Sequence, residues 1–81
     1  MLSCHEYDYI ELVCTFQYPL QVTLKSSQVR YVKALDTARN DQHDECLKAL
    51  EEGKVVLIRL DDILEIRCEV KNPHFESVTF A

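Results

Sequence analysis

The segment Leu20-Gln21-Val22-Thr23-Leu24-Lys25 decides the fold class, because apolar and polar residues alternate through its whole length. Successive side chains of an extended strand point to opposite faces, so this order places its three apolar residues on one buried face. A short polar turn at 26–28 and the β-prone segment 29–36 follow directly. The two segments together predict a β-hairpin.

Upstream of this hairpin, the segment 4–15 has the spacing of an amphipathic helix. Its apolar side chains recur at Ile10, Val13 and Cys14, which is the i, i+3, i+4 pattern of one helical face. Ser3-Cys4-His5-Glu6 matches a capping box, in which a hydroxyl and a carboxylate each accept a hydrogen bond from a free backbone N–H. We therefore expect one helix before the first strand.

Downstream of the hairpin, the segment 45–52 is ambiguous. The spacing of its apolar residues and its helix propensity favour a helix. However, Glu52-Gly53 is a turn signal and the next segment, 54–60, is strongly β-prone, which favours a hairpin between 45–50 and 54–60. The residues alone leave both readings open.

The rest of the chain again predicts strands. In 63–70, Leu64, Ile66 and Cys68 lie on one side of an extended strand and the charged residues on the other. Asn72-Pro73 is a turn signal before a last apolar segment. We expect a mainly β fold, a small antiparallel barrel or sandwich with one N-terminal helix. Its elements are a helix at about 4–15 and strands at about 20–25, 29–36, 44–50, 54–60, 63–70 and 75–80.

Length and charge limit the function. The chain has 81 residues, enough for a single domain over 1–81, and its net charge of −5 opposes direct binding to nucleic acid phosphates. A basic partner is favoured instead. The sequence shows neither a signal-peptide pattern nor a run of about 18 apolar residues, so we expect a cytoplasmic protein without a membrane contact.

The residue types that do chemistry are present but scattered. His5, His43, His74 and the four cysteines lack the C-x₂₋₄-C spacing of a zinc site, so we expect no metal and no cofactor. The cysteines are read as thiols, and three of the four fall on apolar stripes. The adjacent carboxylates at 51–52 and 61–62 are read as solvated turn residues, and the sequence contains no phosphate loop or hydrolase motif. We expect no enzyme activity.

Two stretches of the chain carry a family resemblance: residues 4–14, CHEYDYIELVC, and the segments 33–37, 45–47 and 58–63. The first is similar to the C-x-x-Y-D-x-[LI]-E-L-x-C opening, and the second is similar in order and spacing to the central strands, of the Rof (YaeO-like) family of Rho-specific inhibitors of transcription termination. The resemblance implies an Sm-like fold, and this favours a strand at 45–50. It also implies a protein partner. That partner is the terminator Rho, whose N-terminal RNA-binding domain carries a basic primary RNA site.

The same resemblance gives the acidic N-terminal helix a role. Its polar residues would otherwise be read as a cap and a solvated face, with acidic side chains favoured near the helix N-terminus. A loop expected after the second strand offers further contacts, although turn chemistry also explains such residues. The candidate partner-binding residues are Glu6, Tyr7, Asp8, Glu11, Asp36, Arg39 and Asn40. We expect a monomer that binds Rho; an Sm-like RNA-binding module is the alternative.

Overall fold

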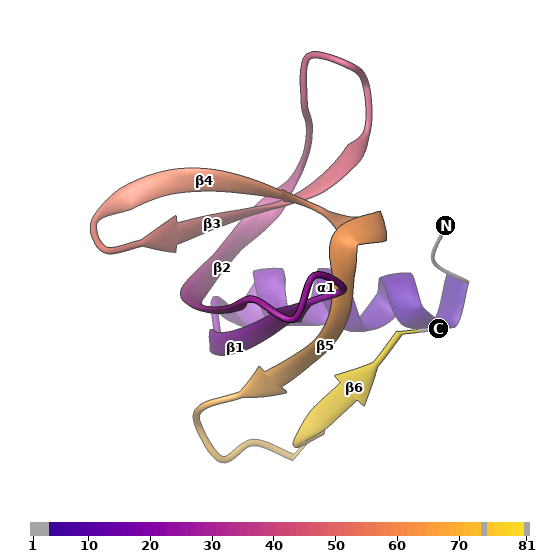
Figure 1. The fold of residues 1–81 in the computed structure, drawn as a ribbon. Helices are drawn as coiled ribbons and strands as arrows, with labels where there is room; N and C mark the ends of the chain where they lie inside the picture. The colour runs from indigo at the N-terminus through magenta and orange to yellow at the C-terminus, as the bar shows by residue number, and fades with distance from the viewer. Residues whose placement is uncertain (1–3, 74, 81) are drawn as a thin grey trace.

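The computed structural model describes residues 4–73 and 75–80, which form one helix and a six-stranded antiparallel sheet (Figure 1). The strand order is β4-β3-β2-β1-β5-β6. The expected mainly β class with one N-terminal helix is confirmed. In chain order the elements are α1 (Cys4–Phe16), β1 (Pro19–Leu24), β2 (Val29–Arg39), β3 (Glu45–Glu51), β4 (Lys54–Arg59), the 3-10 helix η1 (Leu60–Asp62), β5 (Ile63–Cys68) and β6 (Ser77–Thr79).

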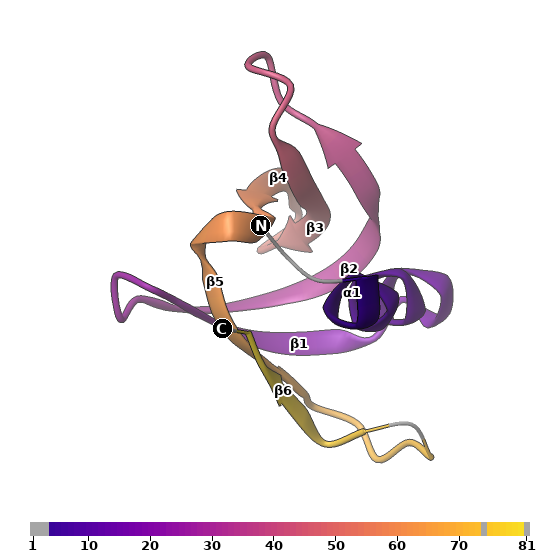
Figure 2. The same ribbon diagram turned by 90° about the vertical axis from the view of Figure 1, so that its right-hand side faces the viewer.

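The sheet is strongly bent, as Figure 2 shows: the long strand β2 runs from beside β1 to the β3–β4 hairpin, which stands away from β1 and β5. The helix α1 packs against β2. The loop between β2 and β3 projects from the body of the molecule (Figure 1). The strands β4 and β6 form the two edges of the sheet.

The helix α1 ends in a hydrogen-bonded reversal. Gln17 has a left-handed backbone (φ 53°), its N–H donates to the Cys14 carbonyl (3.2 Å), and the Tyr18 N–H donates to the Val13 carbonyl (3.1 Å). This pair of bonds is the Schellman arrangement, which satisfies carbonyls left free at a helix end. The chain thus turns directly from α1 into β1. Within residues 4–73 and 75–80, no helix combines the length and the apolar character that crossing a membrane requires.

The ambiguous segment at 45–52 is a strand followed by a turn. Strands β3 and β4 pair without interruption up to Glu51 and Lys54, and the two residues between them, Glu52 and Gly53, have φ of 51° and 81°. Positive φ at both central residues is the requirement of a type I′ turn, the tight turn that matches strand twist. The hairpin reading is therefore correct and the helical reading is wrong.

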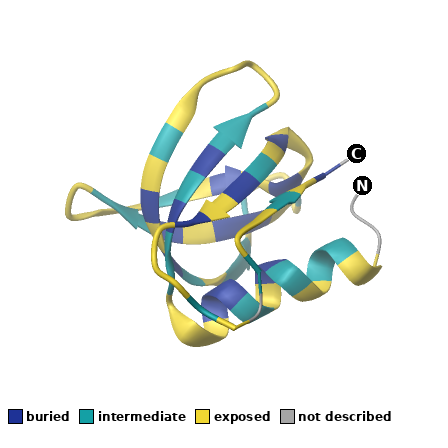
Figure 3. Ribbon diagram, turned by 90° about the horizontal axis from the view of Figure 1, so that it is seen from below, coloured by how far each residue is buried: buried dark blue, intermediate teal, exposed yellow. Residues whose placement is uncertain are grey.

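The core lies between the concave side of the sheet and α1 (Figure 3). In the deciding segment, Leu20 and Val22 are fully buried, as the alternation predicts, and Leu24 is partly buried. Burial of apolar side chains from every element explains why such a short chain folds. The buried residues of this cluster are Ile10, Val13, Cys14, Leu20, Val22, Val32, Ala34, Leu47, Ala49, Ile58, Leu60, Ile63, Ile66, Cys68 and Phe80.

A β-bulge interrupts β2. Ala34 pairs with Ala49 and Asp36 pairs with Lys48, so Leu35 is an extra residue on this strand. Beyond the bulge, β2 continues to pair with β3 as far as Arg39. The expected end of this strand at residue 36 is thus wrong, because residues 37–39 are held by the ladder with β3 and show no alternating apolar pattern.

A second irregularity lies in β5. Leu24 pairs with Ile63 and Thr23 with Glu65, which leaves Leu64 without a register partner in β1. As a result Ile63 is fully buried and Leu64 is 40% exposed. The expectation that Leu64 lies on the buried face of this strand is therefore wrong, whereas Ile66 and Cys68 do lie on that face. The strand also ends at residue 68 rather than at residue 70.

The last strand is shorter than expected. Only Ser77–Thr79 pair with β5, not the whole segment 75–80. Phe80 follows the strand, is 1% exposed and donates its backbone N–H to the Leu64 carbonyl (2.7 Å). Phe75 precedes the strand and meets the Tyr9 ring edge-on at 5.3 Å between centroids. Two aromatic side chains therefore anchor this short strand to the core.

Candidate functional site

One face of α1 carries the polar residues that approach the sheet. Tyr7, Glu11 and Thr15 follow one another at i+4 spacing and therefore form a stripe along the helix. Tyr7 is half-buried against the core, whereas Glu11 is exposed. The Thr15 hydroxyl donates to the Glu11 backbone carbonyl (2.9 Å). This stripe faces β2.

The bulge in β2 supplies the opposite wall. The alternation through Val32 and Ala34 would turn Asp36 into the core, but the extra residue Leu35 changes the phase and leaves Asp36 exposed. Bulges commonly re-aim side chains in this way. The Asp36 carboxylate also accepts a hydrogen bond from the Thr37 backbone N–H (2.8 Å), which orients it.

Together, α1 and β2 border a groove made of two adjacent hollows that share Thr37. The first, of about 390 Å³, brings together Glu11 and Asp36, and the second, of about 240 Å³, brings together Tyr7 and Arg39. We call this the α1–β2 groove. Its lining residues are Tyr7, Glu11, Cys14, Thr15, Leu35, Asp36, Thr37, Ala38, Arg39 and Glu45.

The Cys14 thiol reports the electrostatics of this groove. Its pKa is raised to about 11, first by burial and then by the negative charges of Asp36 and Glu11. The two carboxylates thus act on the same point from opposite walls. The thiol therefore stays protonated near neutral pH, which makes it a weak nucleophile.

Arg39 is tied to its own hairpin. It donates to the His43 carbonyl (2.9 Å) and to the Glu45 carboxylate (3.4 Å), and both charged side chains are about half exposed. An exposed pair of this kind contributes little to stability. Because Glu45 offsets its charge, Arg39 does not make the groove basic.

Asn40 organises the loop after β2. Its side-chain oxygen accepts hydrogen bonds from the backbone N–H groups of Gln42 (3.0 Å) and Asp44 (2.9 Å), and its amide donates to the Asp44 carboxylate (3.0 Å). The turn chemistry weighed for this residue is therefore present. Asn40 lines neither hollow of the α1–β2 groove, so a contact between its side chain and a partner stays a prediction.

The other candidates on α1 lie beside the groove. Glu6 is half-buried and Asp8 is exposed, and neither lines a hollow of the groove. The capping box assigned to Ser3 and Glu6 involves a residue outside the described part of the chain. The structure thus brings together Tyr7, Glu11, Asp36 and Arg39 from the seven candidates, with Glu6, Asp8 and Asn40 at the margins.

Sequence reasoning missed two features. Cys14 was assigned to the core alone, although it also forms part of the groove floor. A further hollow of about 480 Å³ lies at the β5–β6 turn and is lined by Glu69, Lys71, Phe75 and neighbouring residues. The Asn72-Pro73 turn signal marks that place, and the Asn72 side chain bonds the backbone of Phe75 (3.1 and 3.2 Å).

The groups that bind metals or form disulfides are dispersed. Cys14, Cys46 and Cys68 are buried free thiols and Cys4 is an exposed one. Across residues 4–73 and 75–80, no cluster of three or more His, Cys, Asp or Glu side chains is placed to hold a metal ion.

The fold and groove define a class: a small, mainly β protein with one N-terminal helix and an acidic groove between α1 and β2. The family model described as modulator of Rho-dependent transcription termination (ROF) matches residues 1–80. The chain belongs to the Rof family, which modulates Rho-dependent termination and is not enzymatic. The resemblance read from the opening motif and the expectation of no enzyme activity are both confirmed.

Among solved structures, the chain is similar to YaeO bound to magnesium from Vibrio cholerae O395. The two are 39% identical with a TM-score of 0.89, and the match covers 93% of this chain and 97% of that one. The comparison with curated proteins gave no match.

Proposed function

We propose that this chain inhibits Rho-dependent termination by binding the N-terminal RNA-binding domain of Rho and covering its primary RNA site. The observation that carries the proposal is the α1–β2 groove, in which Glu11 of α1 and Asp36 of β2 line the same hollow and both act on the Cys14 thiol. Both elements come from the stretches that resemble the family. The chain would act where transcription takes place, in the cytoplasm.

Charge explains why such a groove suits an RNA site. Rho's primary site is expected to be basic because it binds phosphates, and the carboxylates of Glu11 and Asp36 present the same charge sign as phosphate. Complementary charge speeds encounter and selects the partner. Tyr7 adds a partly exposed aromatic ring in the neighbouring hollow. Proteins that bind single-stranded nucleic acid stack the bases on aromatic side chains, and a tyrosine ring can stack on the same side chains.

The proposal needs no metal and no nucleic acid bound to the chain itself. The magnesium in the Vibrio cholerae structure belongs to that protein, and the described residues of this chain gather no metal-binding cluster. The net charge of −5 opposes RNA phosphates. We therefore propose a monomer that competes with RNA rather than one that binds it.

The test is competition on Rho. A fluorescent single-stranded RNA is bound to Rho, and the chain is added while fluorescence anisotropy is followed. We expect the RNA to be displaced in proportion to added protein. Undiminished RNA binding at saturating protein would contradict the proposal. Filter binding of the same RNA to the chain alone, at low salt, addresses the alternative: tight binding there would favour an RNA-binding module.

A further inference from the structure

The two halves of α1 are held to the body of the molecule in different ways. The C-terminal half contributes all three buried residues of the helix, Ile10, Val13 and Cys14. None of residues 4–9 is buried. The helix has 13 residues, and isolated helices of this length are marginal in water, so packing against other elements must stabilise them. The N-terminal half therefore depends on contacts that fall short of full burial.

That half carries residues on which the proposed function depends. Tyr7 lines the α1–β2 groove, and Glu6 and Asp8 lie at its margin. These side chains meet a partner in a fixed arrangement only if residues 4–9 are already helical in the free chain. Ordering them during binding would lower the affinity. The contacts that hold this half of α1 thus bear on partner binding as well as on stability.

A chain of aromatic rings reaches this half from outside the helix. The Tyr9 ring lies edge-on to Phe75, with 5.3 Å between the ring centroids and 76° between the ring planes. It also lies edge-on to His5 in the first turn of α1 (5.5 Å and 89°). Edge-to-face pairs at such distances are favourable because the ring edge is positive and the ring face negative. The three rings connect the start of α1 to the segment that leads into β6.

Phe75 is itself held from both sides. The Asn72 side chain accepts a hydrogen bond from the Phe75 backbone N–H (3.2 Å) and donates one to the Phe75 carbonyl (3.1 Å). The same side chain donates to the Val70 carbonyl (3.2 Å). Directly after Phe75, the Glu76 carbonyl accepts a hydrogen bond from the Cys68 N–H (2.9 Å), which ties the segment to β5. The ring of Phe75 therefore meets Tyr9 from a backbone that is already ordered.

This contact lies away from the groove. Each residue of an α-helix turns the side chain by about 100°, so Tyr9 points to the flank of α1 nearly opposite to Tyr7. Figure 2 shows the chain before β6 beneath α1, whereas β2 rises above it. Phe75 lines neither hollow of the α1–β2 groove. Any effect of Phe75 on the groove must therefore pass through α1.

From this arrangement we propose that Phe75 is a positioning residue for partner binding. Through Tyr9 it holds the N-terminal half of α1 helical, and so it sets the placement of Tyr7 and Asp8 without contacting the partner itself. This proposal rests on the proposed function, in which α1 meets Rho. It gives the short strand β6 and the Asn72 turn a role, because both hold Phe75 in place.

The first experiment uses the free chain and needs no partner. Solvent exchange of backbone amides is measured by NMR in the unaltered protein, in Phe75→Ala and in Leu24→Ala. Leu24 is the control, because it is another half-buried side chain of the core cluster and lies at the end of β1 that leads away from α1. Loss of an edge-to-face pair changes an equilibrium constant by a factor of about 2 to 12. We expect the amides of Asp8 and Tyr9 to exchange faster by such a factor in Phe75→Ala but not in Leu24→Ala; unchanged exchange in Phe75→Ala would overturn the proposal.

The second experiment measures the Kd for the N-terminal domain of Rho, under conditions in which urea titration shows every variant to be folded. Apparent affinity falls with the fraction of the chain that is competent to bind. We expect Phe75→Ala to raise the Kd about threefold or more, and Leu24→Ala to change it by less than about twofold. Phe75→Tyr should restore binding, because it keeps the ring and the hollow beside Phe75 has room for the hydroxyl. Equal weakening by Phe75→Ala and Leu24→Ala would reduce Phe75 to a general role in stability and would overturn the proposal.

Two further outcomes are decisive. Weaker binding by Phe75→Ala with unchanged exchange at Asp8 and Tyr9 would show that Phe75 contacts the partner directly, which contradicts a positioning role. If Phe75→Ala does not fold, Phe75→Leu takes its place, because it keeps most of the apolar volume but not the ring, and the same changes are expected at smaller size. Failure of the unaltered chain to displace RNA from Rho would refute the proposed function, whereas the exchange measurement would still decide whether Phe75 holds α1.

Discussion

Neutralising the two carboxylates of the α1–β2 groove should weaken Rho binding without disturbing the fold. The double variant Glu11→Gln/Asp36→Asn keeps the size of both side chains and removes two negative charges. Asn retains the oxygen that accepts the Thr37 N–H bond. Because both positions are exposed, the change in folding free energy should stay within about 0.5 kcal/mol.

The magnitude follows from the exposure of these side chains. An exposed carboxylate facing a cation contributes up to about 1 kcal/mol, so the pair contributes up to about 2 kcal/mol. This corresponds to an increase in Kd of about 30-fold. The loss should shrink as salt rises, because the Debye length falls from about 10 Å at 0.1 M to about 3 Å at 1 M.

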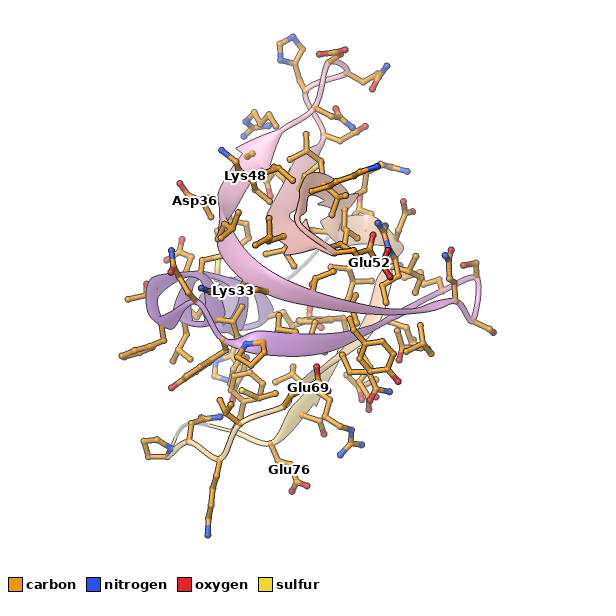
Figure 4. All side chains as sticks on the ribbon, turned by 90° about the vertical axis from the view of Figure 1, so that its left-hand side faces the viewer. Lys33, Asp36, Lys48, Glu52, Glu69 and Glu76 are labelled. Carbon is orange, nitrogen blue, oxygen red and sulfur yellow. The ribbon has the colours of Figure 1, made fainter. Side chains whose placement is uncertain are left out.

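The assay is fluorescence anisotropy with the N-terminal domain of Rho at two salt concentrations. Glu69→Gln/Glu76→Gln is the matched control, because it removes the same charge at the β5–β6 turn, away from the groove (Figure 4). We expect the control to bind within about twofold of the unaltered protein. Equal weakening by both variants would refute the reasoning, since net charge rather than the groove would then control affinity.

The pKa of the Cys14 thiol gives a second measurement on the same double variant. Asp36 and Glu11 raise the pKa of the Cys14 thiol, so its value should fall from about 11 in the double variant. It should remain above the usual 9.0, because burial is the largest cause of the shift. A thiol pKa that does not change would show that the two carboxylates do not act on the groove floor as the geometry implies.

Three further predictions concern stability and reactivity. Asn40→Ala removes three side-chain hydrogen bonds in the β2–β3 loop and should lower the free energy of unfolding by about 1–2 kcal/mol in urea titrations; an unchanged midpoint would contradict its structural role. The Arg30 guanidinium donates hydrogen bonds to both carboxylate oxygens of Glu51 (3.0 and 2.6 Å) and lowers the pKa of that carboxyl. The pair therefore stabilises the fold fully above pH 4.5, the usual pKa of a glutamate. This stabilisation is lost as the pH falls through the lowered pKa. Arg30→Met should therefore show a shallower loss of stability between about pH 5 and pH 2 than the unaltered protein, and parallel curves would argue against the pair. Cys4 is exposed whereas Cys14 is buried with a raised pKa, so iodoacetamide at pH 8 should modify Cys4 first, as peptide mass spectrometry would show; prior modification of Cys14 would contradict its burial.

Local pattern predicts most of this fold. The alternation at 20–24 identifies β1. The Glu52-Gly53 turn signal keeps the β3–β4 hairpin open as an alternative to a helix, and the family resemblance is what favours the strand. The bulge at Leu35 and the displaced Leu64 were not predictable in this way. Each depends on how one strand fits its neighbour, and a shift of one residue reverses the face of every side chain that follows.

The site was predictable in part for the same reason. Tyr7 and Glu11 belong to the opening motif and form a helical stripe that sequence spacing reveals. Their partner Asp36 reaches the groove only because Leu35 is bulged, and no property of its immediate neighbours indicates that. Asn40 shows the opposite case, in which turn chemistry accounts for the residue and leaves its binding role untested.

The measurement that tests the account most directly is an NMR titration of labelled chain with the N-terminal domain of Rho. The account predicts that the largest amide shifts follow both walls of the α1–β2 groove, at Glu11, Thr15, Asp36 and Thr37, and that single-stranded RNA reverses them. Shifts confined to β4 or to the β5–β6 turn, or shifts that RNA leaves unchanged, would contradict it.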